Sequence, residues 1–344
     1  MWFLNNICSC LIFFLGCKTP EDASVETSKQ SSDTNNDDET SNEIASRCEF
    51  ATSNISQASI EADNQSQKAF RLLLQSTFGP QKKDLDKIIQ IGESAWIDEQ
   101  LQHSSAYDVI GDNLSTNLEH YKKIALMAEP STYSDNASFN NNFHGRTSDY
   151  QTAAWFEKAL HAPDQLRYRV AFALSELLVV SGAKQRTRFR GDSLAYYDDI
   201  LAKNTFGNFR DLLNEVSLSP AMGIFLSHQG NKKFMSKTKT HPDENFAREV
   251  MQLFSLGLWK MHDNGSAVES GGDLVPAYTQ EDVEQLARVM TGYDLVGNSN
   301  YGKTHRGAGE EWSTPMEFTG SWHDFDNKSF LSKSVSEESD NASS

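Results

Sequence analysis

The densest group of residues able to do chemistry lies at the start of one expected helix. It comprises His241, Asp243, Glu244, Asn245, Arg248, Glu249 and Gln252. Spacing of four residues places Glu244 and Arg248 on one helical face. Carboxylates and an imidazole can share a proton or bind a cation, and an arginine can hold an anionic substrate group. However, acidic residues in a first helical turn also complement the helix dipole, and Glu244 with Arg248 is an ordinary stabilising pair.

A second polar group lies near the C-terminal end. It comprises His323, Asp324, Asp326 and Lys328. This group could complete a site with the first one if the chain folds back onto that helix; alone, it is typical of a polar turn. A zinc protease is excluded because His241 and Glu244 lack a second histidine at the four-residue spacing that chelation from one helix requires.

Familiar cofactor motifs are absent from the sequence. It has no glycine-rich phosphate loop, no dinucleotide fingerprint and no nucleophile elbow. Asp263-Asn264-Gly265 predicts a turn, and without a glutamate ligand at the twelfth position it is not an EF-hand loop. We therefore identify no cofactor and no metal. The formal charge of -17 and the lack of a basic stripe also argue against nucleic acid as a partner.

Four further residues have a functional and a structural interpretation. His228 follows an apolar segment, and a lone histidine at a helix end more often caps backbone carbonyls than catalyses. Trp96, Trp155 and Tyr293 could stack on sugars. Because aromatic residues at helical spacing more often belong to a core, we favour the structural role for all four.

Apolar residues recur every three or four positions from residue 67 onward, which predicts helices. One helix over 164–178 has a wide apolar stripe, so we expect it to be central. Thr279 and Asp282 form a capping box at a later helix. Strand-like alternation is limited to 273–278 and 317–323, which we expect to pair as a small ribbon. The other helices are expected at 194–201, 209–216, 222–226, 243–256 and 280–290.

The N-terminal residues resemble a lipoprotein leader. Residues 7–16 form an apolar run that is shorter than the roughly 20 residues needed to span a bilayer, but long enough for a signal-peptide core. Gly16 before Cys17 resembles the end of a lipobox, so we expect cleavage there and lipid attachment at Cys17. The first six residues hold no Lys or Arg, and the two residues before Gly16 depart from the usual pattern. An ordinary secretory signal is therefore the alternative.

A polar, acidic segment follows the leader. Residues 18–66 contain 11 acidic and 3 basic side chains and hardly an apolar one. Such a segment cannot bury enough surface to offset its ordering entropy, and its charges repel one another. We predict a disordered tether that holds a domain away from a membrane. No cysteine lies beyond Cys48, so the helical domain has no disulfide framework.

Several sequence blocks are specific in combination. They are Gln75-Ser-Thr-Phe-Gly-Pro80 with Trp96 downstream, Asp164 to Glu176, Asn204 to Asp211, Pro242 to Glu249 leading to Leu256-Gly257, and Thr291-Gly-Tyr293. Together these blocks resemble the secreted bacterial family called domain of unknown function 1800, over residues 69–330. The resemblance implies a helical fold and export, but no established activity. Members of that family continue past the block from His323 to Lys328, so we expect a C-terminal helical portion to be missing here.

The sequence thus predicts a mainly α protein. We expect a multi-helix globular domain with at most a small β-ribbon, preceded by a signal peptide and a disordered linker. The predicted segments are a signal peptide over 1–16, a tether over 17–66, a helical domain over 67–330 and a polar, disordered tail over 331–344.

Two functional hypotheses follow. The first is a lipid-anchored envelope protein with a binding or assembly role, acting with the membrane and with a second exported protein. The second is an envelope hydrolase that uses carboxylates and histidine from the 242–249 and 323–328 blocks. For either one we expect an outer-membrane or cell-surface lipoprotein, with a periplasmic or secreted protein as the alternative. Because no catalytic motif is present, the first hypothesis is favoured.

Overall fold

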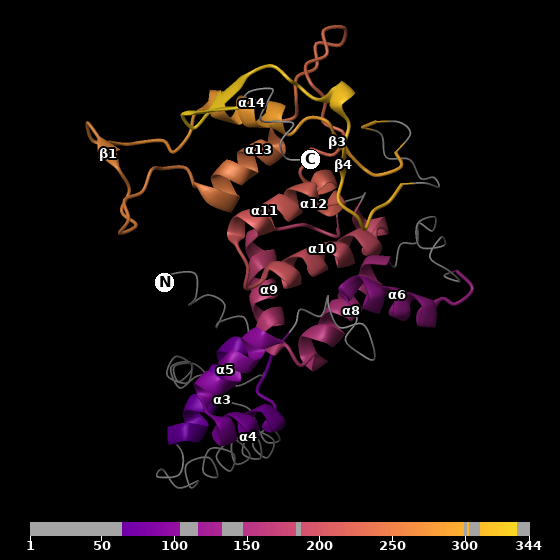
Figure 1. Cartoon of the computed structure of the whole chain (residues 1–344), viewed down its shortest axis with the longest axis vertical. Coiled ribbons are helices and arrows are strands. Elements are labelled where there is room, and N and C mark those ends of the chain that lie inside the picture. Colours follow the sequence, from indigo (N-terminus) through magenta and orange to yellow (C-terminus); the bar gives the residue numbers. More distant parts are fainter. Residues whose placement is uncertain are drawn as a thin grey trace, which may run out of the picture. The chain divides into compact units, whose positions relative to one another are not determined.

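The chain is mainly helical in the part that the structure describes. The structure is a computed structural model that describes residues 64–103, 116–132, 147–183, 187–298, 301–302 and 310–335 (Figure 1). Within these segments the only sheets are small and two-stranded, which confirms the predicted fold class. The predicted leader, Cys17 and nearly all of the tether lie outside the described residues. None of the described helices combines the length and apolarity needed to cross a bilayer.

Three helices at the start of the described chain pack around a tryptophan. They are α3 (Asn64–Ser76), α4 (Lys82–Ile91) and α5 (Glu93–Gln102). Trp96 is buried together with Ile88, as expected for a core aromatic residue. At the end of α5, the buried Gln100 donates to the Pro163 carbonyl at 3.0 Å and accepts from the Leu166 amide at 3.1 Å. This side chain therefore ties the three helices to the next part of the domain.

The deepest part of the domain is built around one helix, α10 (Gly191–Asn204). It packs against α6 (Asn117–Ala128), α8 (Thr147–His161) and α9 (Gln165–Leu177). We predicted that the helix over 164–178 would be central; this region does form α9, but α10 is buried along more of its length. The close packing depends on Gly191, where a Cβ atom would lie 2.1 Å from the Thr147 carbonyl oxygen.

A buried carboxylate joins two of these helices. Asp199, on α10, accepts hydrogen bonds from the backbone amides of Asn117 at 2.6 Å and Leu118 at 3.1 Å. These amides belong to the first turn of α6, where no intrahelical acceptor exists. Burial raises the pKa of Asp199 to about 6, although the amides favour its charged form. Asp199 thus serves as a cap from a distant part of the chain.

The second half of the domain begins with α11 (Phe209–Leu218) and α12 (Pro220–Phe225). The predicted helix over 243–256 is present, but it divides into an α-helical part, α13 (Asn245–Glu249), and a π-helical part, η3 (Val250–Ser255). Helix α14 (Gln280–Val289) has the predicted capping box, because Thr279 and Asp282 accept each other's backbone amides at 3.2 and 2.7 Å. Ala247, Met251, Val283 and Ala287 bury the contact between α13, η3 and α14.

The strands pair differently from the expected ribbon. We predicted that 273–278 would pair with 317–323, which is wrong. Strand β2 (Asp273–Leu274) pairs with β1 (Glu269–Ser270) through a tight glycine turn, and β4 (Glu317–Phe318) pairs with β3 (Tyr293–Asp294). A third hairpin joins β5 (Lys328–Phe330) to β6 (Lys333–Val335), so regular structure extends into the predicted tail. Short 3₁₀ turns are η2 (Thr187–Phe189) and η4 (Gly320–Trp322).

Candidate functional site

Part of the first predicted polar group forms a closed triangle of side chains. Arg248 donates through Nη2 to Glu244 Oε2 and to Gln280 Oε1, both at 2.9 Å. Gln280 in turn donates through Nε2 to the same Glu244 oxygen at 2.8 Å. Glu244 and Arg248 lie at α13, whereas Gln280 is the first residue of α14. The triangle therefore joins two helices that are separated by more than twenty residues of sequence.

The remaining members of that group are dispersed. His241 is exposed, and its ring lies against Phe234 with the centroids 4.7 Å apart. Asp243 is also exposed and accepts from the Asn245 amide at 2.9 Å, a local turn contact. The carboxylate of Glu249 is partly buried, and its Oε2 has no hydrogen-bond partner among the described residues. The side chains of His241, Asp243 and Glu249 do not meet in one catalytic arrangement through the contacts above.

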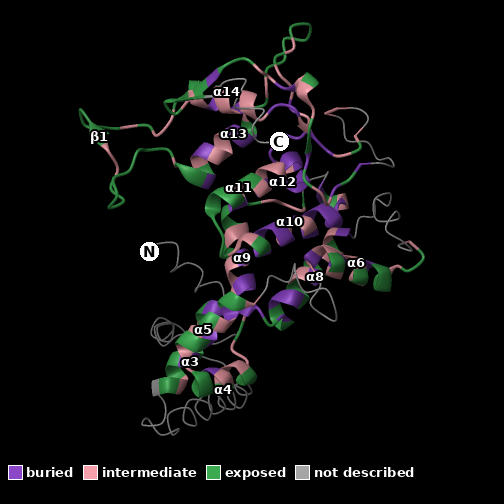
Figure 2. Cartoon of the chain, in the orientation of Figure 1, coloured by how far each residue is buried: buried purple, intermediate pink, exposed green. Residues whose placement is uncertain are grey.

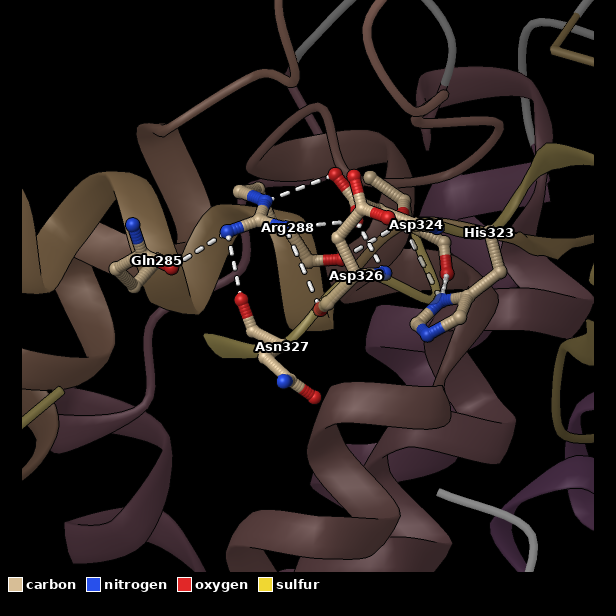
Figure 3. A network of polar contacts seen from close by, with 7 residues as sticks. Gln285, Arg288, His323, Asp324, Asp326 and Asn327 are labelled. Carbon is tan, nitrogen blue, oxygen red and sulfur yellow. Dashed lines mark hydrogen bonds and ion pairs between the residues drawn. The ribbon is translucent and has the colours of Figure 1, made fainter. Parts of the chain in front are cut away.

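The second predicted group is organised around Arg288, at the end of α14 (Figure 3). Its guanidinium donates through Nε and Nη2 to the two carboxylate oxygens of Asp324, each at 2.8 Å. The same guanidinium donates to the backbone carbonyls of Asp326 and Asn327 at 3.3 Å. Burial alone would raise the pKa of Asp324, but the hydrogen bonds and charge of Arg288 outweigh it and lower that pKa. The hydrogen bonds to Asp324 raise the pKa of Arg288.

His323 and Lys328 are both buried beside this pair. His323 Nδ1 lies 2.7 Å from the carbonyl oxygen of Thr291, and the Asp324 amide donates to the Thr291 hydroxyl at 3.0 Å. Lys328 begins strand β5, which packs along α14. These contacts fix the loop between η4 and β5 onto the helix, which is a structural role.

Helix α14 connects the two polar groups. Gln280 holds the first group at one end of the helix, and Arg288 holds the second at the other end. Eight residues of α-helix separate them along the axis by about 12 Å. The two polar groups therefore contact opposite ends of α14 rather than each other. In the described part of the chain, no cluster of three or more His, Cys, Asp or Glu side chains is arranged to hold a metal ion.

The individually considered residues occupy structural positions. His228 is fully buried, and its Nε2 lies 2.7 Å from the Ser217 carbonyl near the end of α11, as expected for a capping histidine. Burial lowers its pKa to about 4, which keeps the ring neutral at physiological pH. Tyr293 packs against Phe318 with ring centroids 5.4 Å apart. Trp155 is only partly buried and lies in a cluster of aromatic rings.

The triangle of Glu244, Arg248 and Gln280 stands at the root of an exposed arm, which we define as residues 258–277. The arm begins shortly after η3 and ends shortly before α14, so the triangle links α13, which precedes the arm, to Gln280, three residues beyond its end. A second root contact joins Tyr278 to Gln252 at 3.4 Å. The polar group that the sequence suggested as a site is thus in part a clamp that closes the arm.

Backbone hydrogen bonds and two tight turns form the arm. The amide of Lys260 donates to the Val275 carbonyl at 2.9 Å, and the amide of Val268 donates to the Lys260 carbonyl at 2.8 Å. One turn is the predicted Asp263-Asn264-Gly265, with Gly265 at a φ of 82°. The other is Gly271-Gly272, where both residues have positive φ. Such backbone conformations favour glycine.

The arm exposes large apolar side chains. Leu258 is 51% exposed, Trp259 41%, Met261 57% and Leu274 40%. Figure 2 shows the exposed class along most of the arm. Exposed single apolar residues are common, but several on one short element mark an interaction surface. Tryptophan and methionine are also enriched in protein interfaces. The arm is therefore a candidate protein interface.

Sequence reasoning did not identify this surface. Pairing within the arm is short and irregular, and the alternation predicted at 273–278 covers only the end of the arm, so it did not mark the whole segment as a surface. Two signals were present, namely the Gly271-Gly272 pair and the predicted turn at Gly265. Two glycine turns six residues apart, with Trp259 and Met261 before them, are the pattern from which the arm could have been found.

The fold and the candidate interface define a class of protein: a helical domain that carries an exposed two-turn arm clamped at its root. The sequence model of the family described as "Protein of unknown function (DUF1800)" matches residues 71–343, and the chain belongs to this family. No curated protein and no solved structure matches the chain significantly.

Proposed function

We propose that this protein is a lipid-anchored component of the bacterial cell envelope whose arm binds a second exported protein. The observation that carries the proposal is the set of exposed apolar side chains at Leu258, Trp259, Met261 and Leu274. A short two-stranded element is only marginally stable alone in water. A partner that covers these side chains would stabilise the arm and gain about 25 cal/mol for each Å² of apolar surface buried.

The proposed anchor supports a partner in the same compartment. Lipid on Cys17 would hold the protein at a membrane, and the acidic segment that follows would set its reach. A flexible chain of the 49 residues from 18 to 66 has a root-mean-square span of about 40 Å, and charge repulsion extends it. The domain could then meet a partner that stands well clear of the membrane surface.

The contacts of the two polar groups favour binding over hydrolysis. Glu244 is held by Arg248 and Gln280, and Asp324 is held by Nε and Nη2 of Arg288. A carboxylate in a double charge-assisted hydrogen bond is a poor proton acceptor for a substrate. In the proposed function, these residues therefore hold the arm and the loop after η4 in position.

Photocrosslinking in cells tests the partner directly. The full chain with its own leader is produced in its bacterial host with a photoreactive phenylalanine in place of Trp259. A matched chain carries the same group in place of Met127, which is 82% exposed on α6. We expect one discrete adduct from position 259, with a protein that has its own export signal, and its loss when Met261→Ser is added. The same adduct from position 127, or an adduct with a cytoplasmic protein, would contradict the proposal.

Metabolic labelling tests the anchor. Cells are grown with a radioactive fatty acid, and the chain is compared with its Cys17→Ser and Cys48→Ser variants. We expect label on the wild type and on Cys48→Ser, and none on Cys17→Ser. Equal labelling of the Cys17→Ser chain would refute lipid attachment at that residue, whereas the arm's partner would be unaffected by that result.

A further inference from the structure

A groove in the helical region takes no part in the proposed arm contact. It lies between α8, α9 and α10 and has a volume of about 440 Å³. Each helix presents one face to it, because the lining residues recur at intervals of three and four. The side chains used below are Gln151, Trp155 and Phe156 from α8, Phe172 and Glu176 from α9, and Asp198 from α10. A groove of this size is in the range of small-molecule sites.

A second hollow continues the groove toward the start of α8. It has a volume of about 390 Å³ and shares Gln151 with the first hollow. Ser148 and Arg188 line this end. Arg188 is exposed, and no ion pair joins it to another residue of the described chain. A guanidinium here is available to a carboxylate or phosphate of a ligand.

Polarity changes steadily along the lining face of α8. Ser148 lies at the polar end, Gln151 follows one turn later, and Trp155 and Phe156 lie two turns along. The eight residue steps from Ser148 to Phe156 span about 12 Å of helix. The groove therefore offers a cation at one end and an apolar wall at the other, which is the complement of an amphipathic anion.

The apolar wall is a packed set of aromatic rings. The Trp155 ring lies edge-on to Phe156 with centroids 5.2 Å apart, and its centroid is 5.8 Å from that of Phe172. Phe156 is 54% exposed, so much of this ring has no contact within the domain. An alkyl chain lying on Phe156 would remove that surface from water.

The middle of the groove is compatible with a bound anionic molecule. Asp198 accepts a hydrogen bond from Gln151 Nε2 at 2.5 Å. Burial raises the pKa of Asp198 to about 8, and the neighbouring charge of Asp199 adds to this effect. At neutral pH the Asp198 carboxyl is therefore mostly uncharged and does not repel an anion. Among the described residues, the charged groups that line the groove are then Glu176 from α9 and Arg188 from the adjoining hollow.

We propose that this groove binds an amphipathic carboxylate of the fatty-acid type. The carboxylate lies on Arg188, and the alkyl chain follows the α8 face to Trp155, Phe156 and Phe172. The placement of the guanidinium at the opposite end from the aromatic wall selects this class over a neutral or cationic amphiphile. Nothing in this assignment depends on the arm or on Cys17.

Calorimetry with three probes of equal chain length tests the assignment. Decanoate, decanol and decyltrimethylammonium are titrated at pH 7, below their micellar concentrations, into the full-length exported chain carrying Cys17→Ser. We expect decanoate to bind saturably and about tenfold more tightly than decanol, because decanoate makes one charge-assisted contact that decanol lacks. The cationic probe should bind most weakly. Absence of saturable binding, equal binding of the three probes, or tightest binding of the cation would each overturn the proposal.

Matched variants locate the two ends of the ligand. Arg188→Gln should weaken decanoate about tenfold and leave decanol unchanged, whereas Phe156→Gln should weaken both probes. The controls are Arg210→Gln on α11 and Phe70→Gln on α3, which remove an exposed cation and an exposed ring outside the groove. Loss of affinity in the controls, or unchanged decanoate affinity in Arg188→Gln, would count against this placement.

Discussion

Helix α10 and the arm are stabilised in different ways. In α10, ten residues from Gly191 to Ala202 are buried, and five neighbouring helices, α6, α8, α9, α11 and α12, pack against it. In the arm over 258–277, nearly every residue is partly or fully exposed, and the order comes from backbone hydrogen bonds, glycine turns and the clamp at the root. The structure of α10 thus depends on the burial of its side chains, whereas the structure of the arm depends on local backbone geometry.

The comparison predicts how each region responds to the loss of a side chain. A buried side chain contributes transfer free energy and packing, whereas an exposed one contributes neither in the isolated protein. Substitutions in α10 should therefore lower the free energy of unfolding, and substitutions in the arm should leave it nearly unchanged while affecting binding.

The largest expected difference is between Leu201→Ala in α10 and Met261→Ala in the arm. Leu201 is fully buried, so its truncation should lower the free energy of unfolding by about 2 to 5 kcal/mol. Met261 is mostly exposed, so its truncation should change that free energy by less than about 0.5 kcal/mol. Urea unfolding of the full chain measures both. Similar losses in the two variants would mean that the arm is packed in solution.

Two glycine substitutions distinguish the effect of close packing on stability from the effect of turn conformation. Gly191→Ala places a methyl group 2.1 Å from the Thr147 carbonyl, so α10 and α8 must move apart, and we expect a loss of about 2 to 3 kcal/mol. Gly265→Ala meets no neighbouring atom but must adopt positive φ, at a cost of about 1 kcal/mol. That cost should be confined to the arm and appear as faster amide exchange there. A global loss from Gly265→Ala would contradict this distinction.

The pH dependence of stability should follow the helical region. Because burial raises the pKa of Asp198 to about 8, the folded chain keeps a proton on this group that the unfolded chain loses near pH 4. The contribution of Asp198 to stability therefore decreases as pH rises from about 4 to 8, by roughly 1 to 3 kcal/mol, and the decrease ends above pH 8. Asp198→Asn should remove this contribution in thermal or urea unfolding, most clearly between about pH 6 and 8, because Asp199 and His228, with pKa values of about 6 and 4, change charge mainly at lower pH. An unchanged slope would place the effect on another group.

The smallest expected effect concerns the clamp. Arg248→Ala removes two hydrogen bonds at the arm root and should cost only about 0.5 to 1 kcal/mol globally, because the contact is partly exposed. Amide exchange at Lys260 and Val275 should nevertheless accelerate. The control is Lys82→Ala, which breaks an exposed pair with Asp86 on α4. If both variants change exchange in the arm equally, the triangle does not hold the arm.

The helices could be predicted wherever local signals agree. The capping box of Thr279 and Asp282 and the apolar spacing at 209–216 and 280–290 led to α14 and α11 because those signals lie within a few residues of one another. The depth of α10 was not predicted, because Asp192 and Asp199 interrupt its apolar pattern. Both are buried in the folded chain, and Asp199 is satisfied by amides at the start of α6.

The candidate sites needed long-range information. The spacing of Glu244 and Arg248 predicted their pair, but Gln280, which completes the triangle, is 32 residues beyond Arg248. The groove draws on three helices, and no motif links Gln151, Phe172 and Asp198 in the sequence. The ribbon was predicted with the wrong partners because β2 is joined to β1 by the adjacent Gly271-Gly272 turn, whereas β4 pairs with β3, a strand of two residues that lies more than twenty residues earlier and shows no alternating pattern.

The clamp at the arm root also has an evolutionary consequence. Because Arg248 and Gln280 fix the two ends of the arm onto α13 and α14, residues between the ends can change in number without moving those helices. Exposed loops tolerate insertions for this reason, and both glycine turns are suitable points for them. The arm is therefore a segment in which insertions can lengthen the exposed surface while the buried helices stay the same.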